Sequence, residues 1–411
     1  MVPPLSGTTF LQMRRICAMA VNASFSGFPP PSRLLRLGFV GGGEGALIGT
    51  VHANGARLSN RWHIVAGALS SDPERARRSG RAWMLDDDRI YSDFGQMAQR
   101  EAECSDGIDA VVITTPNHLH HAVASAFLDA GIDVISDKPL TTNLDDALEL
   151  VRHQQTTGLV FGVTYAYAAH VMVRQAREMI RYGMLGDVRQ IHVEYFQEWA
   201  VNLTDQDGER PWRLEPAKVG AAFTVGDIGT HAMHLACFAT GKELEQVRAL
   251  FHVAGAPKSL EDTAFMHLRF EGGVPGTLMV SQAAAGTQCG LRLRVFGSLA
   301  GLEWNQENPE HLLFTPLDSP TQIISRGYSA GMYPAAARFV RMPRGHPEAL
   351  TDAWANLYTE FAVAIDARRS GRTLPEGLLA YPDVIDGAKG VRFVQAAVQS
   401  NATGEWVDCR L

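Results

Sequence analysis

Two residues four positions apart, Asp227 and His231, have the types and the spacing of an acid–base pair. They lie in the stretch GDIGTH (226–231), which we predict to open a helix that ends at Gly241. Residues at i and i+4 of a helix share one face. A carboxylate near an imidazole orients the ring and stabilises its protonated form, as a general base requires. The alternatives are an N-cap aspartate beside a buried histidine, or a metal site completed by His234.

A third candidate is Lys138, in the sequence DKP (137–139) after an apolar run. A lysine beside an aspartate is usually a solvated surface pair. Here the proline fixes the direction of the chain after a buried strand, so we expect the ammonium to point into a ligand cleft. Lysine at such a place can orient a hydroxyl or a carbonyl, or move a proton if its pKa is lowered.

A glycine-rich stretch, GGGEGALIG (41–49), also follows an apolar run. Glycines allow backbone N–H groups to approach a pyrophosphate at a helix N-terminus. The stretch fits the permissive G-x-G-x-x-A form of the dinucleotide fingerprint, and we predict cofactor contacts at Gly41, Gly43, Glu44 and Ala46. We interpret the loop as lengthened, with either Ala46 or the later Gly49 in close contact with the helix. An ordinary glycine-rich turn is the alternative.

The end of the second predicted strand bears on the choice between NAD and NADP. An acid there would hold the ribose 2′-hydroxyl and repel a 2′-phosphate. Ser70 stands at that position, and Arg75 follows about one helical turn later. The hydroxyls of Ser70 and Ser71, together with Arg75, can accept a 2′-phosphate, whereas Asp72 can take the role of the acid. The sequence therefore leaves both cofactors open.

The stretch TTPNHLHH (114–121) follows another apolar run. Ligands of open parallel sheets bind at the carboxyl ends of the strands. Three crowded histidines lack the i, i+4 spacing of a helical metal pair, so we predict a cofactor segment and no metal. The residues predicted to contact the cofactor in this stretch and the next are Thr115, Pro116, Asn117, His120, Asp137 and Lys138.

Parallel β-α-β units would bring these residues together. Short apolar runs alternate with helical segments at 34–40, 63–69, 108–114, 132–136 and 159–165. We count 108–114 as the fourth strand and 159–165 as the sixth. The later runs at 188–196, 261–270, 276–282 and 291–297 alternate apolar and polar residues, which is typical of an antiparallel sheet with one buried face. Helical patterns return at 350–369 and 381–399.

The predicted fold is therefore α/β, with a Rossmann doubly wound parallel sheet in a dinucleotide-binding domain at 34–160. A second α/β domain at 161–411 has an open, mainly antiparallel sheet for substrate binding and oligomerisation. The 411 residues agree with two domains. Residues 1–33 are expected to form a disordered leader, because the apolar stretch after Arg14-Arg15 is too short and broken for an export signal.

The composition narrows the class of partner. With 46% hydrophobic and 20% charged residues, the chain is not of a disordered type. A net charge of -7 argues against binding to nucleic acid or to an anionic membrane, since both attract positively charged proteins. The five scattered cysteines predict reduced thiols in the cytoplasm. We expect a cytoplasmic protein with a small-molecule partner.

The glycine loop, TPNHLH, DKP and GDIGTH together resemble the Gfo/Idh/MocA oxidoreductases from about residue 34 onward. The resemblance implies hydride transfer between NAD or NADP and a hydroxyl of a sugar, cyclitol or related polyol. The lysine of the family's E-K-P matches Lys138, and its D-x-x-x-H matches Asp227 and His231. Asp137 replaces the usual glutamate.

The resemblance also implies a substrate side of the site. Trp199 in QEW (197–199), Trp212 and Arg213 look like the segment with which pyranose-oxidising members hold their substrate. In YAY (165–167), Tyr167 is expected to contact substrate, whereas Ala166 stands where many relatives carry asparagine. With Lys138, Asp227 and His231, these residues complete the predicted substrate site.

The sequence therefore predicts an NAD(P)-dependent dehydrogenase that acts on a secondary hydroxyl of a cyclic polyol or sugar. His231 would take the hydroxyl proton, Asp227 would orient His231 and the substrate, and Lys138 would polarise the same oxygen. A dimer or tetramer is expected. The alternatives are a non-catalytic protein that binds NAD(P) and sugars, and a sugar–sugar oxidoreductase with a tightly bound cofactor.

Overall fold

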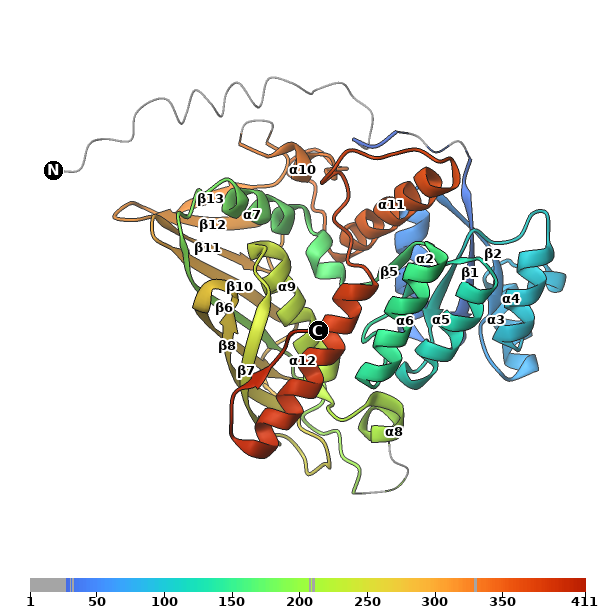
Figure 1. The fold of residues 1–411 in the computed structure, drawn as a ribbon, viewed down its shortest axis with the longest axis horizontal. Coiled ribbons are helices and arrows are strands. Elements are labelled where there is room, and N and C mark those ends of the chain that lie inside the picture. The colour runs from blue at the N-terminus through green and yellow to red at the C-terminus, as the bar shows by residue number, and fades with distance from the viewer. Residues whose placement is uncertain (1–26, 30, 32, 207, 209–210, 329–330) are drawn as a thin grey trace.

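The chain is built around two β-sheets, which form the right and left parts of the computed structural model in Figure 1. The structure describes residues 27–29, 31, 33–206, 208, 211–328 and 331–411. The first sheet is entirely parallel. Its order is β2 (Trp62–Ala68), β1 (Leu35–Gly41), β3 (Ala110–Thr114), β4 (Asp133–Ser136) and β5 (Phe161–Val163). The predicted Rossmann sheet is confirmed.

Helices cover both faces of the first sheet. Side chains on one face, such as Val111 and Ile113, share a core with α4 (Phe94–Glu103), α5 (His120–Asp129) and α6 (Leu144–Thr157). The other face, which includes Leu37 and Phe39, packs against α2 (Leu47–Leu58) and α11 (Leu350–Arg369). Since α11 comes from near the end of the chain, the first sheet depends on a segment predicted to belong with the second.

The structure differs from the predicted six strands of this sheet. The segment between α3 (Pro73–Ala82) and α4 holds a single turn of 3-10 helix at Asp87–Arg89. Only Ile90 then forms a parallel bridge, to Gly67 of β2. Three consecutive aspartates at 86–88 are poor strand residues, so the segment does not extend this bridge into a strand.

Within the described residues the second sheet has nine strands, of which the sequence identified four. Its order is β13 (Gln322–Ser325), β12 (His311–Pro316), β11 (Ala300–Asn305), β10 (Gly290–Gly297), β6 (Val188–Phe196), β9 (Val274–Ser281), β8 (Thr263–Phe270), β7 (Leu244–His252) and β14 (Val407–Asp408). The β6–β9 pair is parallel, and the other pairs are antiparallel. The expected open, mainly antiparallel sheet is confirmed.

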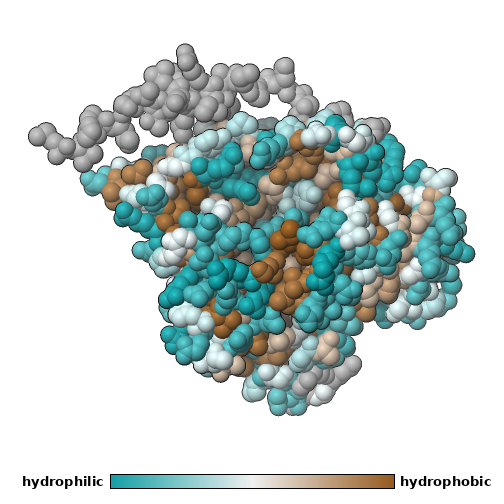
Figure 2. Space-filling model, viewed as in Figure 1, coloured by the Kyte–Doolittle hydropathy of each residue, from teal (hydrophilic) through white to brown (hydrophobic). Residues whose placement is uncertain are grey.

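One face of the second sheet is buried under helices. These are α7 (Val171–Arg181), α9 (Thr230–Thr240) and α12 (Val384–Thr403), whose apolar residues share a core with the strands. In Figure 1, α12 runs between the two sheets, and in Figure 2 a hydrophobic strip flanked by hydrophilic residues lies near the middle of the same view. The short helices α8 (Pro216–Val219) and α10 (Pro334–Ala337) lie in the connections.

Part of the segment predicted as a leader packs against the rest of the protein. Most of the predicted leader, residues 1–26, lies outside the described residues, but Phe28 is buried against Phe339 and Arg33 pairs with Asp109. Phe28 and Arg33, which were expected to belong to the leader, therefore contact the folded part of the chain. Among the described residues, no helix is both long and apolar enough to cross a membrane.

Candidate active site

The candidate site lies where strands β1, β3 and β4 end at the same edge of the first sheet. These strands end at Gly41, Thr114 and Ser136, immediately before the glycine loop, the TPNHLH stretch and DKP. The edge is the one at which parallel open sheets bind their ligands. The sequence placed all three motifs at this edge, and the strand ends lie there.

His120 ties two of these segments together from inside the protein. Its Nδ1 lies 2.9 Å from the carbonyl oxygen of Pro139, and its Nε2 lies 2.9 Å from that of Thr115. Burial lowers the pKa of this histidine, so the ring is neutral. Within this part of the structure His120 holds the loops in place. Asn117, in contrast, reaches toward the carbonyl oxygen of Val219 at 3.5 Å.

The glycine loop has no room for side chains. Gly41 has φ of +83°, and a Cβ there would lie 2.8 Å from the backbone of Thr114. A Cβ on Gly43 would lie 2.6 Å from the carbonyl oxygen of Leu69. Gly49 packs so closely on Gly42 that a Cβ would lie 2.3 Å from the Gly42 carbonyl oxygen. The close contact with the helix therefore belongs to Gly49.

Ala46 and Glu44 have other places in the loop. Ala46 is the N-cap residue of α2, and its N–H donates to the carbonyl oxygen of Gly43 at 3.0 Å. The Glu44 N–H donates to the Ser79 hydroxyl, and its exposed carboxylate pairs with Arg78. The Glu44 side chain is thus engaged with α3.

The region expected to select NAD or NADP lies at the start of α3. Asp72 is the N-cap of this helix and accepts the Arg75 N–H at 2.7 Å. The Asp72 N–H in turn donates to the Ser70 hydroxyl. One Asp72 oxygen is therefore used in helix capping, and the Ser70 hydroxyl accepts a hydrogen bond within the same turn.

Lys138 and Asp227 form the central ion pair of the site. Lys138 Nζ donates to Asp227 Oδ1 at 2.7 Å and to the Asp227 carbonyl oxygen at 2.8 Å. Burial by itself would raise the pKa of Asp227. The charge of Lys138 and hydrogen bonds from Lys138 and Gln282 outweigh that effect and lower the pKa to about 2. The carboxylate is ionised throughout the physiological range.

The second Asp227 oxygen is held by a residue that the sequence did not single out. Gln282 Nε2 donates to Asp227 Oδ2 at 2.7 Å, and Gln282 Oε1 accepts the Thr224 hydroxyl at 2.8 Å. Gln282 is 0% exposed. It follows the last residue of β9, so only the tertiary fold brings it to Asp227. Its Nε2 also lies 3.3 Å from Gln197 Oε1.

The predicted partnership of Asp227 with His231 takes a different form. The hydrogen bonds of the Asp227 carboxylate go to Lys138 and Gln282, not to His231. Residues Val225–Gly229 form a π-helical turn before α9, which changes the angular spacing of the two side chains. The carboxylate acts on His231 through its charge, which raises the pKa of the imidazole.

His231 itself is neutral and lies among aromatic rings. Burial, followed by the charge of Lys138, lowers its pKa well below the ordinary value. Its ring lies edge-on to Tyr167 at a centroid distance of 4.9 Å and to Tyr165 at 5.7 Å. Its Nδ1 is buried with no hydrogen-bond partner among the described residues.

Tyr167 belongs to a buried network beside His231. Its hydroxyl lies 2.5 Å from that of Tyr195, which in turn lies 3.2 Å from Cys289 Sγ. Gln197 Nε2 donates to the Tyr195 hydroxyl at 3.2 Å. Tyr195 and Cys289 lie on or next to alternating strands, and no sequence signal separates them from ordinary core residues.

The predicted substrate residues Trp199, Trp212 and Arg213 lie together. The Arg213 guanidinium carbon is 4.4 Å from the Trp212 ring centroid and 5.7 Å from that of Trp199. These indoles are 48% (Trp199) and 38% (Trp212) exposed. The positive charge of Arg213 also contributes to the low pKa of Asp227, which places this group within electrostatic reach of the ion pair.

A possible metal cluster lies elsewhere. Among the described residues, ligand atoms of His121, Asp146 and Glu149 lie within 4.8 Å of one another. Asp146 already accepts a hydrogen bond from the Asn143 side chain, and His121 pairs with Glu149 at 3.4 Å. These residues include none of the predicted catalytic ones.

The site fits a dinucleotide. The backbone cradle at Gly41 and Gly43 would be filled by any Cβ, and the buried Thr115 hydroxyl has no partner among the described residues. Such a cradle before a helix N-terminus suits a pyrophosphate. The fold and this edge define an oxidoreductase that binds a nicotinamide dinucleotide.

The comparisons with known proteins agree with this class. Residues 35–165 match an oxidoreductase family described as an NAD-binding Rossmann fold, and residues 173–303 match the GFO/IDH/MocA C-terminal domain. The chain belongs to the Gfo/Idh/MocA oxidoreductase family.

Several relatives cover more than nine-tenths of the chain. The uncharacterised oxidoreductase YfiI of Bacillus subtilis is 35% identical, over 92% of this chain and 97% of its own. A crystal structure of an oxidoreductase from Sinorhizobium meliloti is 43% identical, with a TM-score of 0.83 over 92% of this chain and 100% of that one. An inositol dehydrogenase homologue from Azotobacter vinelandii, in complex with NAD+, is 36% identical, with a TM-score of 0.87 over 94% and 100%. A second structure of the latter contains NADH and myo-inositol.

Proposed function

We propose that the protein is a dehydrogenase that transfers hydride between NAD(P) and a secondary hydroxyl of a cyclic polyol or sugar. The observation that carries the proposal is the Lys138–Asp227 pair beside the neutral His231, at the edge that also carries the glycine cradle. The Azotobacter relative was solved with myo-inositol, which supports a cyclic polyol as the substrate class.

The glycine loop and the Thr115 segment would hold the dinucleotide, whose nicotinamide ring supplies the hydride acceptor or donor. The backbone around Gly41 and Gly43 can approach the pyrophosphate, because neither residue carries a side chain. Asp137 accepts the Lys138 N–H and the Thr164 hydroxyl, and thereby fixes the turn from which Lys138 projects.

In the proposed chemistry His231 receives the hydroxyl proton. A general base must be unprotonated before the step, and the lowered pKa keeps His231 neutral. Lys138 donates a hydrogen bond to the same oxygen and stabilises the negative charge that develops there. Asp227 holds the Lys138 ammonium by two contacts, so we propose that its role is to position Lys138 rather than to bind His231.

The substrate ring would lie against the tryptophans. Flat apolar faces of cyclic polyols and sugars pack on aromatic rings, and Trp199 and Trp212 are both partly exposed beside Arg213. Tyr167 lies next to His231, with the two ring centroids 4.9 Å apart. We propose that these residues select a ring that carries several hydroxyl groups.

We also propose a homo-oligomer. The second sheet has an outer face with large exposed apolar side chains, at Leu250, Phe265, Phe296, Leu313 and Ile323. Exposed apolar residues gathered on a wide sheet favour contact with another copy of the chain. Sedimentation velocity would test this, since a monomer at micromolar concentration contradicts the proposal.

One experiment tests the activity. The formation of reduced nicotinamide would be followed by its absorbance, with NAD+ and NADP+ in turn, against inositols, pyranoses and glycosides. We expect saturable turnover with at least one cyclic polyol or pyranose. Tight cofactor binding without turnover on any member of the panel would favour a non-catalytic binding protein. Cofactor retained through purification, with ping-pong kinetics, would favour exchange between two sugars.

A further inference from the structure

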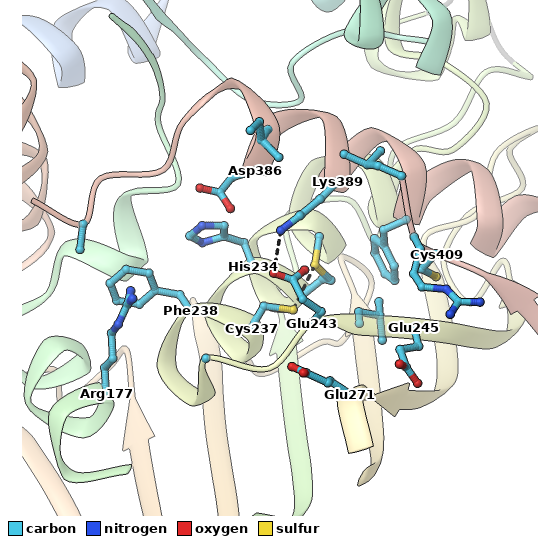
Figure 3. Close-up of a pocket in the computed structure, with 18 of the residues that line it drawn as sticks. Arg177, His234, Cys237, Phe238, Glu243, Glu245, Glu271, Asp386, Lys389 and Cys409 are labelled. Carbon is cyan, nitrogen blue, oxygen red and sulfur yellow. Dashed lines mark hydrogen bonds and ion pairs between the residues drawn. The ribbon is translucent and has the colours of Figure 1, made fainter. Parts of the chain in front are cut away.

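A cavity of about 700 Å³ lies beside the candidate active site. Its walls come from α7, α9, the start of β7, α12 and the C-terminal residues of the chain (Figure 3). None of the residues predicted for cofactor or substrate lines it. His234, which lines the cavity, follows the proposed base His231 by three positions on α9. The cavity is therefore separate from the proposed catalytic site.

Arg177 is the cation of this cavity that forms no ion pair with any described residue. Its guanidinium carbon lies 4.3 Å from the Phe238 ring centroid, and Figure 3 shows the two side chains together at one end of the cavity. Within the described part of the chain, it has no hydrogen bond or ion pair. The neighbouring arginines of α7 are paired, Arg174 with Glu360 and Arg181 with Glu178. Five guanidinium N–H donors are thus left for a ligand.

His234 is a second polar group of the cavity that forms no hydrogen bond with the described residues. It is 5% exposed, and it stacks on Tyr165 with the ring centroids 4.4 Å apart. Across the described residues, its ring nitrogens make no hydrogen bond. Burial, together with the charges of Arg177 and Lys389, lowers its pKa to about 3. A neutral imidazole therefore offers one donor and one acceptor to the cavity.

The other charged groups limit the charge of a ligand. The basic side chains Lys389 and Arg410 are paired with Glu243 and Asp408, at 2.7 and 2.6 Å. The cavity is also lined by four acidic side chains, at Glu243, Glu245, Glu271 and Asp386. Glu245, Glu271 and Asp386 therefore leave the cavity with more negative than positive charge. A dianion would be repelled, and only a single negative charge placed directly against Arg177 is matched by a cation that is unpaired among the described residues. Carboxylates also accept hydrogen bonds from hydroxyl groups.

We propose that this cavity binds a small organic acid with one carboxylate and several hydroxyl groups. The carboxylate accepts the two parallel N–H groups of Arg177, a geometry that guanidinium and carboxylate share. The hydroxyl groups donate to Asp386 and exchange hydrogen bonds with His234. Met233, Leu244 and Phe393 supply apolar walls for the carbon chain. The volume lies within the range of small-molecule sites.

Isothermal titration calorimetry with sodium gluconate, at an ionic strength held constant with sodium chloride, tests the proposal on the full-length protein. We expect saturable binding to the unaltered protein. R177Q should weaken binding at least about tenfold, because a hydrogen-bonded charge pair is lost, and R177K should weaken it less. The matched control R181Q removes an arginine of the same helix that lies outside the cavity, and it should bind gluconate normally.

Further arms separate this site from the catalytic one. D227N alters the proposed active site and leaves the cavity lining intact. The D227N protein should therefore bind gluconate with unchanged affinity, whether or not the proposed dehydrogenase activity exists. Inorganic phosphate and myo-inositol should each bind this cavity more weakly than gluconate. Absence of gluconate binding, equal affinity in R177Q, loss of binding in D227N, or tighter binding of phosphate would each overturn the proposal. Thermal unfolding without ligand identifies any variant that fails to fold. If R177Q fails to fold, the comparison of R177K with the unaltered protein tests the proposal.

Discussion

Lys138 and Asp227 are joined twice, because Lys138 Nζ lies 2.8 Å from the carbonyl oxygen and 2.7 Å from Oδ1 of Asp227. Lys138 follows β4 of the first sheet, and Asp227 lies in the turn before α9, over the second sheet. One ion pair thus connects the dinucleotide edge with the segment that carries His231. It also explains the low pKa of Asp227, since the ammonium favours the ionised carboxylate.

The first prediction concerns the two residues proposed to act on the substrate oxygen. K138M and H231A should each lower kcat/KM by about 10²–10⁴-fold, the usual contribution of a positioned acid or base. Steady-state kinetics on the best substrate of the panel would measure this. K242M is the matched control, since Lys242 contacts the Glu271 carbonyl oxygen and has no place in the site. Near-normal turnover in both active-site variants would contradict the mechanism.

The second prediction concerns the protonation of His231. The charge of Lys138 lowers the His231 pKa, whereas that of Asp227 raises it. K138M should therefore move the His231 pKa upward, toward its ordinary value, and D227N should move it further down. In the unaltered protein His231 is neutral and Asp227 is ionised at neutral pH, so neither group should produce a limb of the pH–rate profile near neutrality. NMR titration of labelled histidine would measure the shifts, and shifts of the same sign would refute this electrostatic account.

The structure shows which parts of the site can be predicted from sequence. Gly41, Lys138 and Thr115 follow unalternated apolar runs, and the ends of neighbouring parallel strands must meet at one edge. Gln282 could not be found in this way. It follows an ordinary alternating strand, and its contact with Asp227 depends on the packing of β9 beneath the turn before α9. Partners of this kind are set by tertiary structure, which no local pattern encodes.

The same limit applies to the fold. The five strands of the first sheet and four strands of the second were predictable, because their periodicity is local. The placement of α11 over the first sheet was not, since a helix with apolar residues on most sides does not specify its partner. Trp354 and Leu357 of α11 are buried with Phe39 of β1. The predicted count of six strands was one too high, because the segment near Ile90 forms a single bridge to β2 instead of a strand.

The third prediction tests Gln282 as a positioning residue. Q282L removes the hydrogen bond to Asp227 Oδ2 and leaves the Thr224 hydroxyl without its acceptor. The pKa of Asp227 should rise, and kcat should fall about tenfold while KM for the dinucleotide stays unchanged. Loss of activity on the acid side should then begin at a higher pH than in the unaltered protein. Q190L, on the exposed side of β6, is the matched control. A fall in stability with an unchanged pH profile would indicate a purely structural role.

The fourth prediction concerns the lengthened glycine loop. G49A would place a Cβ 2.3 Å from the carbonyl oxygen of Gly42, so the loop and α2 must separate. We expect the Kd for the dinucleotide, measured by fluorescence titration, to rise at least about tenfold, since the cradle for the pyrophosphate is displaced. G95A on α4 is the control, because a Cβ there meets only Asp93 Oδ1 at 3.3 Å. Unchanged dinucleotide affinity in G49A would place the pyrophosphate away from this loop.

The fifth prediction addresses the choice between NAD and NADP. Ser70 stands at the end of β2, where an acid would hold a ribose 2′-hydroxyl, and Asp72 uses one oxygen to cap α3. S70D introduces a negative charge beside the expected 2′-phosphate position. It should raise KM for NADP+ about tenfold or more through repulsion and leave KM for NAD+ nearly unchanged. S319D, which adds the same charge on an exposed turn after β12, is the matched control. Equal effects of S70D on both cofactors would mean that the adenosine ribose does not lie against this turn.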